Sequence, residues 1–328
     1  MNLKQPRFWY KKNIFNSIIS KIFLFFSLIY LLLFFLRKIR AKKIKLNKQI
    51  ITIGNIVVGG SGKTPAAIKI KQIIDNNKLR SVFLTRGYKG NLQGPLIINK
   101  NHNIKETGDE ALLLSSYGKV IIAKKRHEIN DFLKTISEEY LILDDGLQNP
   151  HIQHDTKIAV IDEQYLFGNK YFLPAGPLRC PIKSTLDKVD IILLIGKDYK
   201  NNLPNDLLIY KNKIYRGKYK VIGAYNKKQR YYAFSALANN DKFFYSLKKE
   251  GLVVNNQKSF PDHHYYSESE ILKLRDEAKK LNLKLITTSK DIVKIPKKYQ
   301  KEITEFKIEL ELMEEQKFTK KLLSCLKK

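Results

Sequence analysis

The sequence predicts an α/β protein with a mostly parallel sheet and helices on both faces of that sheet. Six apolar runs rich in Val, Ile and Leu predict buried strands, and stretches of helical length separate several of them. The runs are 49–53, 81–85, 119–123, 140–143, 157–161 and 189–195. Apolar strands that alternate with helices are typical of a parallel sheet covered on both sides. A glycine-rich turn at 54–64, directly after the first strand, is typical of P-loop NTPases.

Composition excludes several classes of protein. With 328 residues, 43% of them hydrophobic, the chain can bury a core, and intrinsic disorder is excluded as its main state. Cys180 and Cys325 are too few to staple a fold of this size, and the six His show no metal-ligand spacing. The formal net charge of +30 indicates an anionic partner.

The first segment, 1–48, predicts a membrane-associated helix with a basic collar. Twelve Lys and Arg lie between Lys4 and Lys48, no Asp or Glu precedes Asp75, and 22–36 is uncharged and apolar. A cleaved signal peptide is disfavoured because basic residues, rather than a small-residue site, follow the apolar run. A spanning helix and a helix lying in the interface both remain open. A buried core helix fits less well, since apolar residues lie all round the helix.

The rest of the chain predicts two α/β domains and a linker. Residues 49–205 form the expected nucleotide-binding domain. The polar, Tyr- and Lys-rich stretch 206–230 predicts a linker, which we expect to be two-stranded. A second alternation of strands and helices predicts a smaller C-terminal α/β domain over 231–328; its elements are strands at 231–236 and 284–288 and helices at 241–249 and 267–281.

The glycine-rich turn predicts a phosphate-binding loop. Glycines let backbone N–H groups converge on phosphate, and the N-terminus of the following helix adds partial positive charge. Lys63 would reach the β- and γ-phosphates of a nucleotide, and the Thr64 hydroxyl would bind Mg²⁺. Val57 stands where the motif has its first glycine, so an ordinary glycine-rich turn is the alternative. The predicted nucleotide-binding residues are Gly59, Gly60, Ser61, Gly62, Lys63 and Thr64.

Two adjacent acids, Asp144 and Asp145, end the strand at 140–143. Carboxylates at this edge of the sheet, beside a phosphate loop, predict a magnesium site. Adjacent side chains on a strand point in different directions, so one acid would bind Mg²⁺ directly and the other through water. The sequence does not decide which. Two aspartates that cap a turn are the alternative interpretation.

Further polar clusters are candidates for the acceptor side of the reaction. They lie at 85–90, 107–110, 125–126, 168–169, 174–179 and 260–264, and several follow strands, where open α/β folds bind ligands. A kinase that acts on a hydroxyl needs a group to accept or orient its proton. Asp109 and His263 are the predicted pair. Taken singly, Asp109 also fits a helix cap and His263 a surface turn.

The motifs together resemble one family, the tetraacyldisaccharide 4′-kinases (lipid A 4′-kinases), over nearly the whole chain. The blocks that carry the resemblance are Gly-Gly-Ser-Gly-Lys-Thr-Pro (59–65), Thr-Arg-Gly-Tyr (85–88), Gly-Asp-Glu (108–110), Asp-Asp-Gly-Leu-Gln (144–148), Gly-Asn (168–169), Pro-Ala-Gly-Pro-Leu-Arg (174–179) and Phe-Pro-Asp-His-His (260–264). The resemblance implies an enzyme on the cytoplasmic face of the bacterial inner membrane. It would transfer the γ-phosphate of ATP to the 4′-hydroxyl of a tetraacylated glucosamine disaccharide 1-phosphate, giving lipid IVA.

The resemblance also implies roles for individual residues. Asp109 and His263 match the catalytic dyad, one from each domain, so that closure of a cleft between the domains would assemble the base. Asp144 and Asp145 match the metal acids, with Mg²⁺ and ATP as the implied cofactor and co-substrate. The substrate or phosphate contacts expected from the matching blocks are Arg86, Tyr88, Glu110, Arg126, Gln148 and Arg179.

Four positions depart from the family's usual residues. Leu147 and Asn149 stand where the family has Phe and His, Cys180 stands in place of a Glu, and Ser289 also replaces a common Glu. Asn149 removes an imidazole and Cys180 removes a carboxylate that we expect near the substrate. None of the four changes the phosphate loop, the paired acids or the dyad, so activity is still expected.

Two other classes of protein remain as alternatives. A membrane-docked GTPase-type switch is suggested by Asp-Lys-Val-Asp at 187–190, although Asp replaces the Asn of the guanine-reading motif. A nucleic-acid-binding ATPase is suggested by the charge and the 18 Tyr. The resemblance favours neither. We therefore predict a lipid substrate and a membrane as partners, with no nucleic acid and no obligate protein partner.

Overall fold

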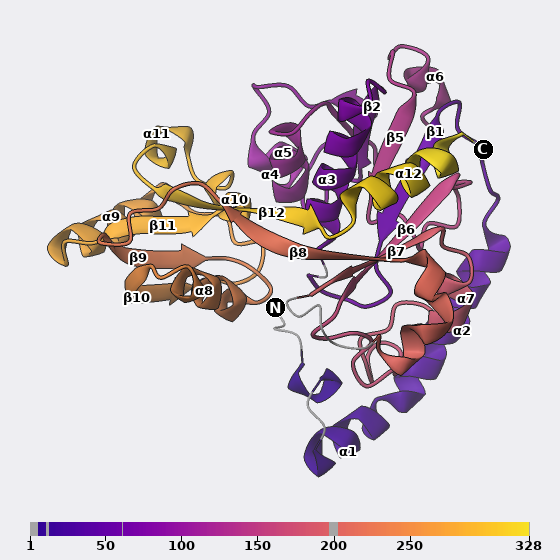
Figure 1. Cartoon of the computed structure of the whole chain (residues 1–328), viewed down its shortest axis with the longest axis horizontal. Coiled ribbons are helices and arrows are strands. Elements are labelled where there is room, and N and C mark those ends of the chain that lie inside the picture. The colour runs from indigo at the N-terminus through magenta and orange to yellow at the C-terminus, as the bar shows by residue number, and fades with distance from the viewer. Residues whose placement is uncertain (1–5, 11–12, 61, 197–202, 328) are drawn as a thin grey trace.

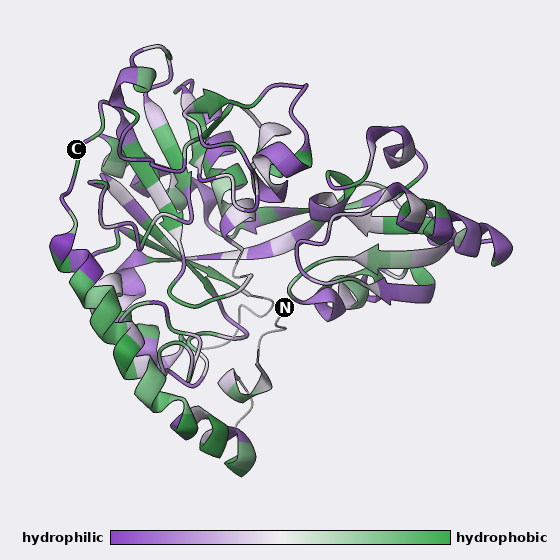
Figure 2. Ribbon diagram, turned by 180° about the vertical axis from the view of Figure 1, so that it is seen from behind, coloured by the Kyte–Doolittle hydropathy of each residue, from purple (hydrophilic) through white to green (hydrophobic). Residues whose placement is uncertain are grey.

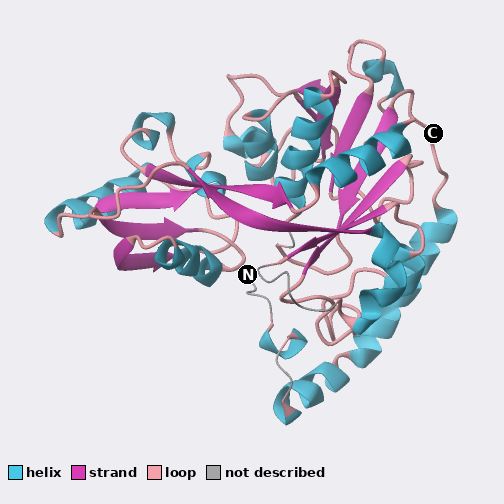
Figure 3. Ribbon diagram, viewed as in Figure 1, coloured by secondary structure: helices cyan, strands magenta, loops and turns pink. Residues whose placement is uncertain are grey.

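A computed structural model describes residues 6–10, 13–60, 62–196 and 203–327 (Figure 1). The strands of this described part form one sheet in the order β10-β9-β11-β12-β8-β7-β6-β1-β5-β2-β4-β3. Its neighbouring strands are parallel except at β12–β8 and β3–β4. The predicted α/β class, a mostly parallel sheet with helices, is confirmed (Figure 3).

The strands are β1 (Gln49–Gly54), β2 (Ser81–Thr85), β3 (Leu96–Ile97), β4 (Val120–Ile122), β5 (Tyr140–Asp144), β6 (Thr156–Asp162), β7 (Ile191–Ile195), β8 (Ile214–Ile222), β9 (Arg230–Ser235), β10 (Val253–Ser259), β11 (Lys284–Thr288) and β12 (Thr304–Leu312). The helices are η1 (Arg7–Trp9), α1 (Ile14–Ile22), α2 (Leu24–Arg40), α3 (Lys63–Asn76), α4 (Ile104–Thr107), α5 (Asp109–Ser115), α6 (Asn130–Leu133), α7 (Ile182–Leu186), η2 (Asn205–Lys213), α8 (Asn240–Lys249), α9 (Glu268–Lys280), α10 (Ser289–Ile292), α11 (Lys297–Gln300) and α12 (Glu315–Leu326).

Strands β1 to β7 and their helices form a large lobe. The strands of this lobe are apolar throughout because side chains on both faces of the sheet are buried. In β1, Ile51 and Ile53 pack in a cluster with α3, α5 and α12, whereas Ile50 packs on the opposite face in a cluster with α6. A third cluster covers β6 and β7 with Leu186 of α7 and Leu207 of η2. Both faces of the sheet are buried, as continuous apolar strands require.

Strands β9, β10 and β11 form a small lobe with α8 to α11. One apolar cluster packs β9 and β11 against α9, and another packs them against α8. In Figure 1 the small lobe (orange to yellow) projects from the large lobe, and the long strands β8 and β12 run between the two. These two strands pair antiparallel from Gly217–Leu312 to Ile222–Lys307.

The second strand of the connection does not come from the predicted linker. Of the two connecting strands, the range 206–230 supplies β8, and its partner β12 comes from 304–312, which we assigned to the C-terminal domain. The helix that follows, α12, then packs on the large lobe, where Phe318, Leu322 and Leu326 join the cluster of α3 and α5. The boundary predicted at 231–328 is therefore wrong at its C-terminal end, because the last strand carries the chain back across the connection.

In the described part of the N-terminal segment, the predicted helix is broken into α1 and α2, which follow the short η1 and are bent by 50° at their junction. Three of their polar side chains face the protein, since Asn16, Ser20 and Ser27 are buried. Phe34 of α2 also packs on the large lobe. Their apolar side chains face outward, so that α2 appears mostly hydrophobic in Figure 2. No single described helix has the length and hydropathy of a membrane span, but α1 and α2 meet both criteria when taken together.

The packing of α12 predicts a measurable contribution to stability. Replacing the fully buried Leu322 with Ala removes methyl groups from the large-lobe core and leaves a cavity. We expect the free energy of unfolding to fall by about 2–5 kcal/mol. Chemical denaturation should detect the change. Lys320→Ala, at an exposed position of the same helix, is the control, and an equally small effect of both substitutions would contradict this packing.

Candidate active site

The glycine-rich loop joins β1 to α3 at the carboxyl edge of the sheet. Gly62 caps α3 with a φ of 88°, a left-handed conformation that favours glycine, and a Cβ at this position would collide with the hydroxyl of Tyr219 on β8. Lys63 and Thr64 are the first residues of the helix. Its N-terminus, with unpaired N–H groups and the positive end of the dipole, favours an anion. The predicted contact Ser61 lies outside the described residues.

The paired acids face the start of this helix. The Thr64 hydroxyl donates a hydrogen bond to Oδ2 of Asp144 at 3.2 Å, and Nζ of Lys63 lies 3.9 Å from Oδ1 of Asp145. Asp144 ends β5, which pairs with β1, so parallel pairing brings the acids to the glycine-rich loop. Asp145 turns away from the strand with a φ of 55°. The two carboxylates therefore point to different partners, as their adjacent positions predict.

The environment of Asp144 fits a divalent cation. Burial raises the pKa of this carboxyl, and the nearby carboxylates of Glu110 and Asp145 raise it further against the opposing effect of Lys63. Its Oδ1 atom is buried, and no described residue forms a hydrogen bond with it. Within the described ranges no three His, Cys, Asp or Glu side chains gather as a metal cluster. Mg²⁺ commonly takes one or two carboxylates and completes its shell with waters and phosphates, which this arrangement allows.

Asp145 is held by arginine. Nη1 and Nη2 of Arg179 donate to its two carboxylate oxygens at 2.7 and 3.3 Å, and Nη1 also donates to Oδ1 of Asn55 at 2.9 Å. Burial raises the pKa of Asp145, but Lys63 and Arg179 outweigh it and lower that pKa overall. Arg126 is almost fully buried behind the acids, where Nη1 donates to the backbone carbonyl of Asp144 at 3.4 Å and Nε has no partner.

Asp109 and His263 meet across the two lobes. Asp109 begins α5 of the large lobe, and His263 lies in the loop between β10 and α9 of the small lobe, with a φ of 59°. Nδ1 of His263 lies 2.9 and 2.8 Å from the two carboxylate oxygens of Asp109. Asp109 is fully buried, and the imidazole is 14% exposed.

The charge state of Asp109 fixes which nitrogen of His263 carries the proton. Burial raises the pKa of Asp109, but the hydrogen bond with His263 and the charges of Lys290 and Lys294 outweigh it and lower that pKa to about 2. An ionised carboxylate only accepts hydrogen bonds, so Nδ1 must donate. In the neutral ring Nε2 then carries the lone pair. It lies 3.7 Å from Oδ2 of Asp262.

Two other predicted contacts, Tyr88 and Glu110, lie around the dyad, whereas a third, Arg86, feels the charges of Asp145 and Arg179. The ring of Tyr88 meets that of His263 edge to face, with centroids 5.5 Å apart. Glu110 pairs with Lys290 of the small lobe at 3.5 Å. Arg86 is exposed, and burial of part of its side chain together with the charge of Arg37 on α2 lowers its pKa.

Comparison with known proteins identifies the family of this chain. The family model of tetraacyldisaccharide-1-P 4′-kinase matches residues 19–327. The chain is 37% identical to the tetraacyldisaccharide 4′-kinases of Rickettsia conorii and Rickettsia africae, over 90% of both chains in each case. This chain belongs to the tetraacyldisaccharide-1-P 4′-kinase family. Its fold matches a crystal structure of LpxK from Aquifex aeolicus in complex with ATP, with a TM-score of 0.74, 26% identity, and coverage of 94% of this chain and 99% of that one.

Within this 4′-kinase the departures from the family's usual residues lie in packed positions. The side chain of Leu147 packs against Gly54, where a Cβ would clash with it. Asn149 is buried and accepts from the backbone N–H of His151 at 3.1 Å, so it shapes a turn. Cys180 is buried in an apolar cluster, and its sulfur lies 3.5 Å from Nε2 of Gln148. The hydroxyl of Ser289 is buried without a partner, and nothing in the structure explains this substitution.

The predicted contact Gln148 binds within the protein. Its amide nitrogen donates to the backbone carbonyl of Asn55 at 2.5 Å. Its Oε1 is buried without a partner. Gln148 therefore ties the turn after β5 to the segment after β1. In the described structure, Gln148 and Arg179 hold other protein groups of the kinase.

Two polar blocks that we placed among the acceptor-site candidates also hold the N-terminal helices. Asn169 donates through Nδ2 to Oγ of Ser20 at 3.0 Å, and its backbone N–H donates to the carbonyl of Trp9. In the 174–179 block, the N–H of Ala175 donates to Oγ of Ser27, and the carbonyl of Arg179 accepts from the hydroxyl of Tyr30 at 2.9 Å. Both blocks fix α1 and α2 to the large lobe.

Lysines of the small lobe are the site residues that the sequence did not identify. Lys290 and Lys294 lie 3.9 and 3.8 Å from Oδ2 of Asp109. Both follow β11, where we singled out Ser289 only as a departure. Their spacing of four residues, just after a strand that ends at the site, is the signal that could have found them.

The dyad predicts non-additive kinetics. Asp109→Asn and His263→Ala should each lower kcat by about 10²–10⁴-fold, the usual contribution of a positioned base, and leave the KM for ATP nearly unchanged. Since both residues act through one hydrogen bond, the double variant should be little worse than the worse single variant. Steady-state kinetics of the four proteins measures this. Fully additive losses would show that the two residues act separately.

Proposed function

We propose that this member of the tetraacyldisaccharide-1-P 4′-kinase family transfers the γ-phosphoryl group of ATP to the 4′-hydroxyl of the acylated disaccharide with Asp109 and His263 as its base. The contact of Nδ1 of His263 with Asp109 at 2.8 Å, from opposite lobes, is the observation that carries this assignment. It leaves Nε2 free to accept a proton. It also makes the base complete only when the lobes are together.

Each chemical role falls to a described side chain. His263 accepts the proton of the 4′-hydroxyl at Nε2 while its Nδ1–H stays bonded to Asp109, and the sugar oxygen forms the new bond to the γ-phosphorus. The bond between that phosphorus and the β,γ-bridging oxygen breaks, and ADP leaves with the electron pair. Lys63 and the N-terminus of α3 offset the charge on the phosphates. The carboxylate of Asp109 stabilises the imidazolium that forms.

Mg²⁺ is proposed at the Thr64 hydroxyl and Asp144, with Asp145 as an outer partner. The unpaired, buried Oδ1 of Asp144 supports this assignment, because a carboxylate oxygen in that state needs a cation or a proton. Asp145 already has Arg179 as its partner at 2.7 Å. A bound magnesium ion supplies charge neutralisation on the phosphates of ATP. Lys63 and the glycine-rich loop then act as a P-loop.

The proposed location is the cytoplasmic face of the bacterial inner membrane, with α1 and α2 in contact with the bilayer. The surfaces of soluble proteins rarely expose many neighbouring apolar side chains, as α1 and α2 do. The exposed apolar side chains of the two helices are Ile14, Phe15, Ile18, Ile22, Phe25, Phe26, Leu28, Ile29, Leu32, Leu33, Phe35 and Ile39. Basic residues at the end of α2 would meet anionic headgroups. An acylated sugar would reach the base from such a surface.

Transfer of label from ATP tests the catalytic assignment. The protein in detergent should move the γ-phosphate of ATP onto the tetraacylated disaccharide 1-phosphate, and Lys63→Ala should lower the rate by about 10²–10³-fold, since a cation at the phosphates is lost. Lys69→Ala is the control, because Lys69 lies on the same helix but pairs with Glu315. Full activity of Lys63→Ala would remove the loop from the site. GTP preference or stimulation by nucleic acid would favour one of the two alternative classes.

Vesicle binding tests the membrane assignment. Charged residues in the outward face of α2, as in Phe25→Glu with Phe26→Glu, should abolish sedimentation with vesicles that contain anionic lipid, since carboxylates resist burial in the bilayer. Tyr245→Glu, at an equally exposed aromatic position of α8, is the control and should bind like the original protein. Unchanged sedimentation of the α2 variant would contradict the assignment of this face.

A further inference from the structure

Lys294 is a fully buried lysine on the turn after α10 of the small lobe. Its Nζ donates to Oδ1 of Asp291 at 2.9 Å and to the carbonyl of Ala236 at 3.1 Å. The side chains of both Lys294 and Asp291 are 0% exposed. A buried ammonium group is tolerated only where carboxylates and other acceptors replace its water. Lys294 has such partners within its own lobe.

The partner of Lys294 is itself held rigidly. Oδ1 of Asp291 accepts from the backbone N–H of Ala236 at 3.1 Å and from the hydroxyl of Tyr266 at 3.2 Å. Oδ2 accepts from the hydroxyl of Thr288 at 2.7 Å. Groups from β9, β11 and the segment before α9 thus fix one carboxylate. The hydrogen bonds that hold Lys294 therefore lie within the small lobe and do not depend on the large lobe.

A second carboxylate approaches Lys294 from the large lobe. Oδ2 of Asp109 lies 3.8 Å from Nζ of Lys294, and the same oxygen lies 2.8 Å from Nδ1 of His263. The other charged or titratable groups around Asp109 are Lys290, which pairs with Glu110, and Tyr265, Asp262 and Asp291. Of these cations, Lys290 is 24% exposed and Lys294 is not exposed at all. Solvent therefore screens the charge of Lys294 least.

We propose that Lys294 is a positioning residue of the dyad, which holds the Asp109 carboxylate ionised and oriented toward His263 when the lobes meet. This inference rests on the proposed function. Lys294 reaches neither phosphate nor sugar in this role, because its Nζ is enclosed by Asp291, Ala236 and Asp109. It acts through Asp109: without the adjacent ammonium group this buried carboxylate would gain a proton more readily. A protonated Asp109 would accept more weakly from Nδ1 and would carry no charge to stabilise the imidazolium.

The test is the pH profile of kcat/KM for Lys294→Gln in the full-length protein, in detergent, with ATP and the tetraacylated disaccharide 1-phosphate. Gln removes the charge but can still donate to the carbonyl of Ala236. We expect kcat to fall about tenfold, the equivalent of roughly one pKa unit of lost interaction. The KM for ATP should stay unchanged. The acidic limb should move to higher pH, because the Asp109–His263 pair binds a proton more easily without the adjacent cation.

A double-mutant cycle separates this role from a structural one. In the Asp109→Asn background no carboxylate charge remains for Lys294 to stabilise, so Lys294→Gln should have little further effect on kcat. Lys294→Arg keeps the charge and should retain the acidic limb of the original protein. Equal losses of kcat in both backgrounds, or an unmoved acidic limb in Lys294→Gln, would overturn the proposal.

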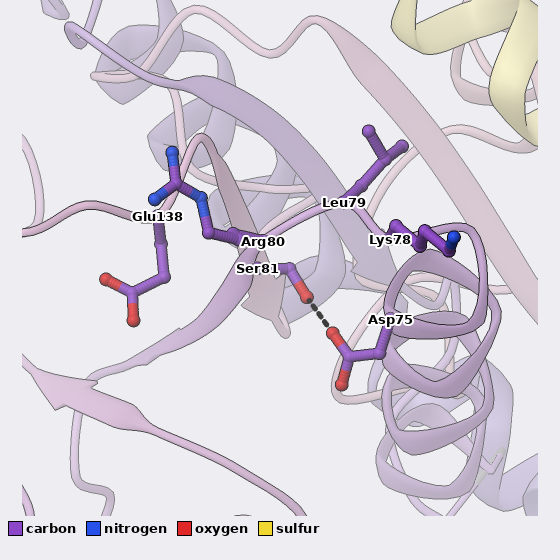
Figure 4. A pocket seen from close by; sticks show the side chains of 6 residues that line it. All are labelled: Asp75, Lys78, Leu79, Arg80, Ser81 and Glu138. Carbon is purple, nitrogen blue, oxygen red and sulfur yellow. Dashed lines mark hydrogen bonds between the residues drawn. The ribbon is translucent and has the colours of Figure 1, made fainter.

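Lys71 provides a matched control. It is another buried lysine, on α3, whose Nζ donates to Asp75 at 3.1 Å and to the carbonyl of Ser81 at 2.9 Å. Figure 4 shows Asp75 and Ser81 beside a hollow that Glu138 also lines, at the end of α3 that lies away from Lys63. Lys71→Gln should lower the melting temperature without moving the acidic limb. A shift as large as that of Lys294→Gln would overturn the proposal.

The design also separates failure of the inference from failure of the proposed function. If the original protein transfers no phosphate to the disaccharide, the proposed function is wrong. If it transfers phosphate and Lys294→Gln keeps the original profile, only the role of Lys294 is wrong. Should Lys294→Gln not fold, Lys294→Arg carries the test alone: a tenfold loss of kcat or a moved acidic limb in that folded, charged variant would contradict the proposal.

Discussion

The hydrogen bond between His263 and Asp109 forms only where two separately packed lobes touch, and much of the rest of the structure serves that contact. Strands β8 and β12 connect the lobes and hold α12 on the large one. Further polar contacts join the two lobes: Lys290 with Glu110, and Lys297 with the carbonyl of Lys100 at 3.1 Å. On another part of the small lobe, Lys242 of α8 pairs with Asp162 at 2.7 Å. The lobes therefore meet through polar contacts, which can be broken and remade at small cost.

Burial gives each acid of the site a different state. Asp109 has cations around it, and its pKa falls to about 2 despite its burial. Asp145 has Arg179. Among the described residues, Asp144 has only the Thr64 hydroxyl as a side-chain hydrogen-bond partner, and its pKa rises. The same residue type thus accepts from an imidazole, pairs with an arginine, or accepts from a hydroxyl, according to its partners. Only part of the net charge of +30 comes from cations beside these acids, since many of the lysines lie elsewhere in the chain.

The sequence predicted the fold where the signal is local. Apolar strands, the glycine-rich turn and the acids after β5 follow from residues close together in the chain, and the structure places Thr64 beside Asp144 as expected. The dyad was predicted from the chemistry a kinase needs and from the resemblance, and the structure brings Asp109 and His263 together. Their separation of 154 residues means that no periodicity could have shown the contact.

Other features escaped because they depend on long-range pairing. Strand β12 alternates apolar and charged residues and could have been found by that period, but its partner could not. Asn169 and Ala175 belong to motifs, but they bind α1 and α2, and a motif alone does not reveal such a contact. Lys294 gave only the weak signal of its spacing from Lys290 after a strand, because a lysine among many is uninformative until its burial is known. Residue type predicts chemistry, and packing decides which chemistry is used.

The protonation of His263 tests the central claim most directly. Nuclear magnetic resonance of protein labelled with ¹⁵N in histidine distinguishes a protonated from an unprotonated ring nitrogen, and His263→Gln identifies the signals of this ring. Near neutral pH, with ATP bound, we predict a protonated Nδ1 hydrogen-bonded to Asp109 and an unprotonated Nε2. A ring with its single proton on Nε2 would contradict the account, because it could neither donate to Asp109 nor accept the proton of a sugar hydroxyl.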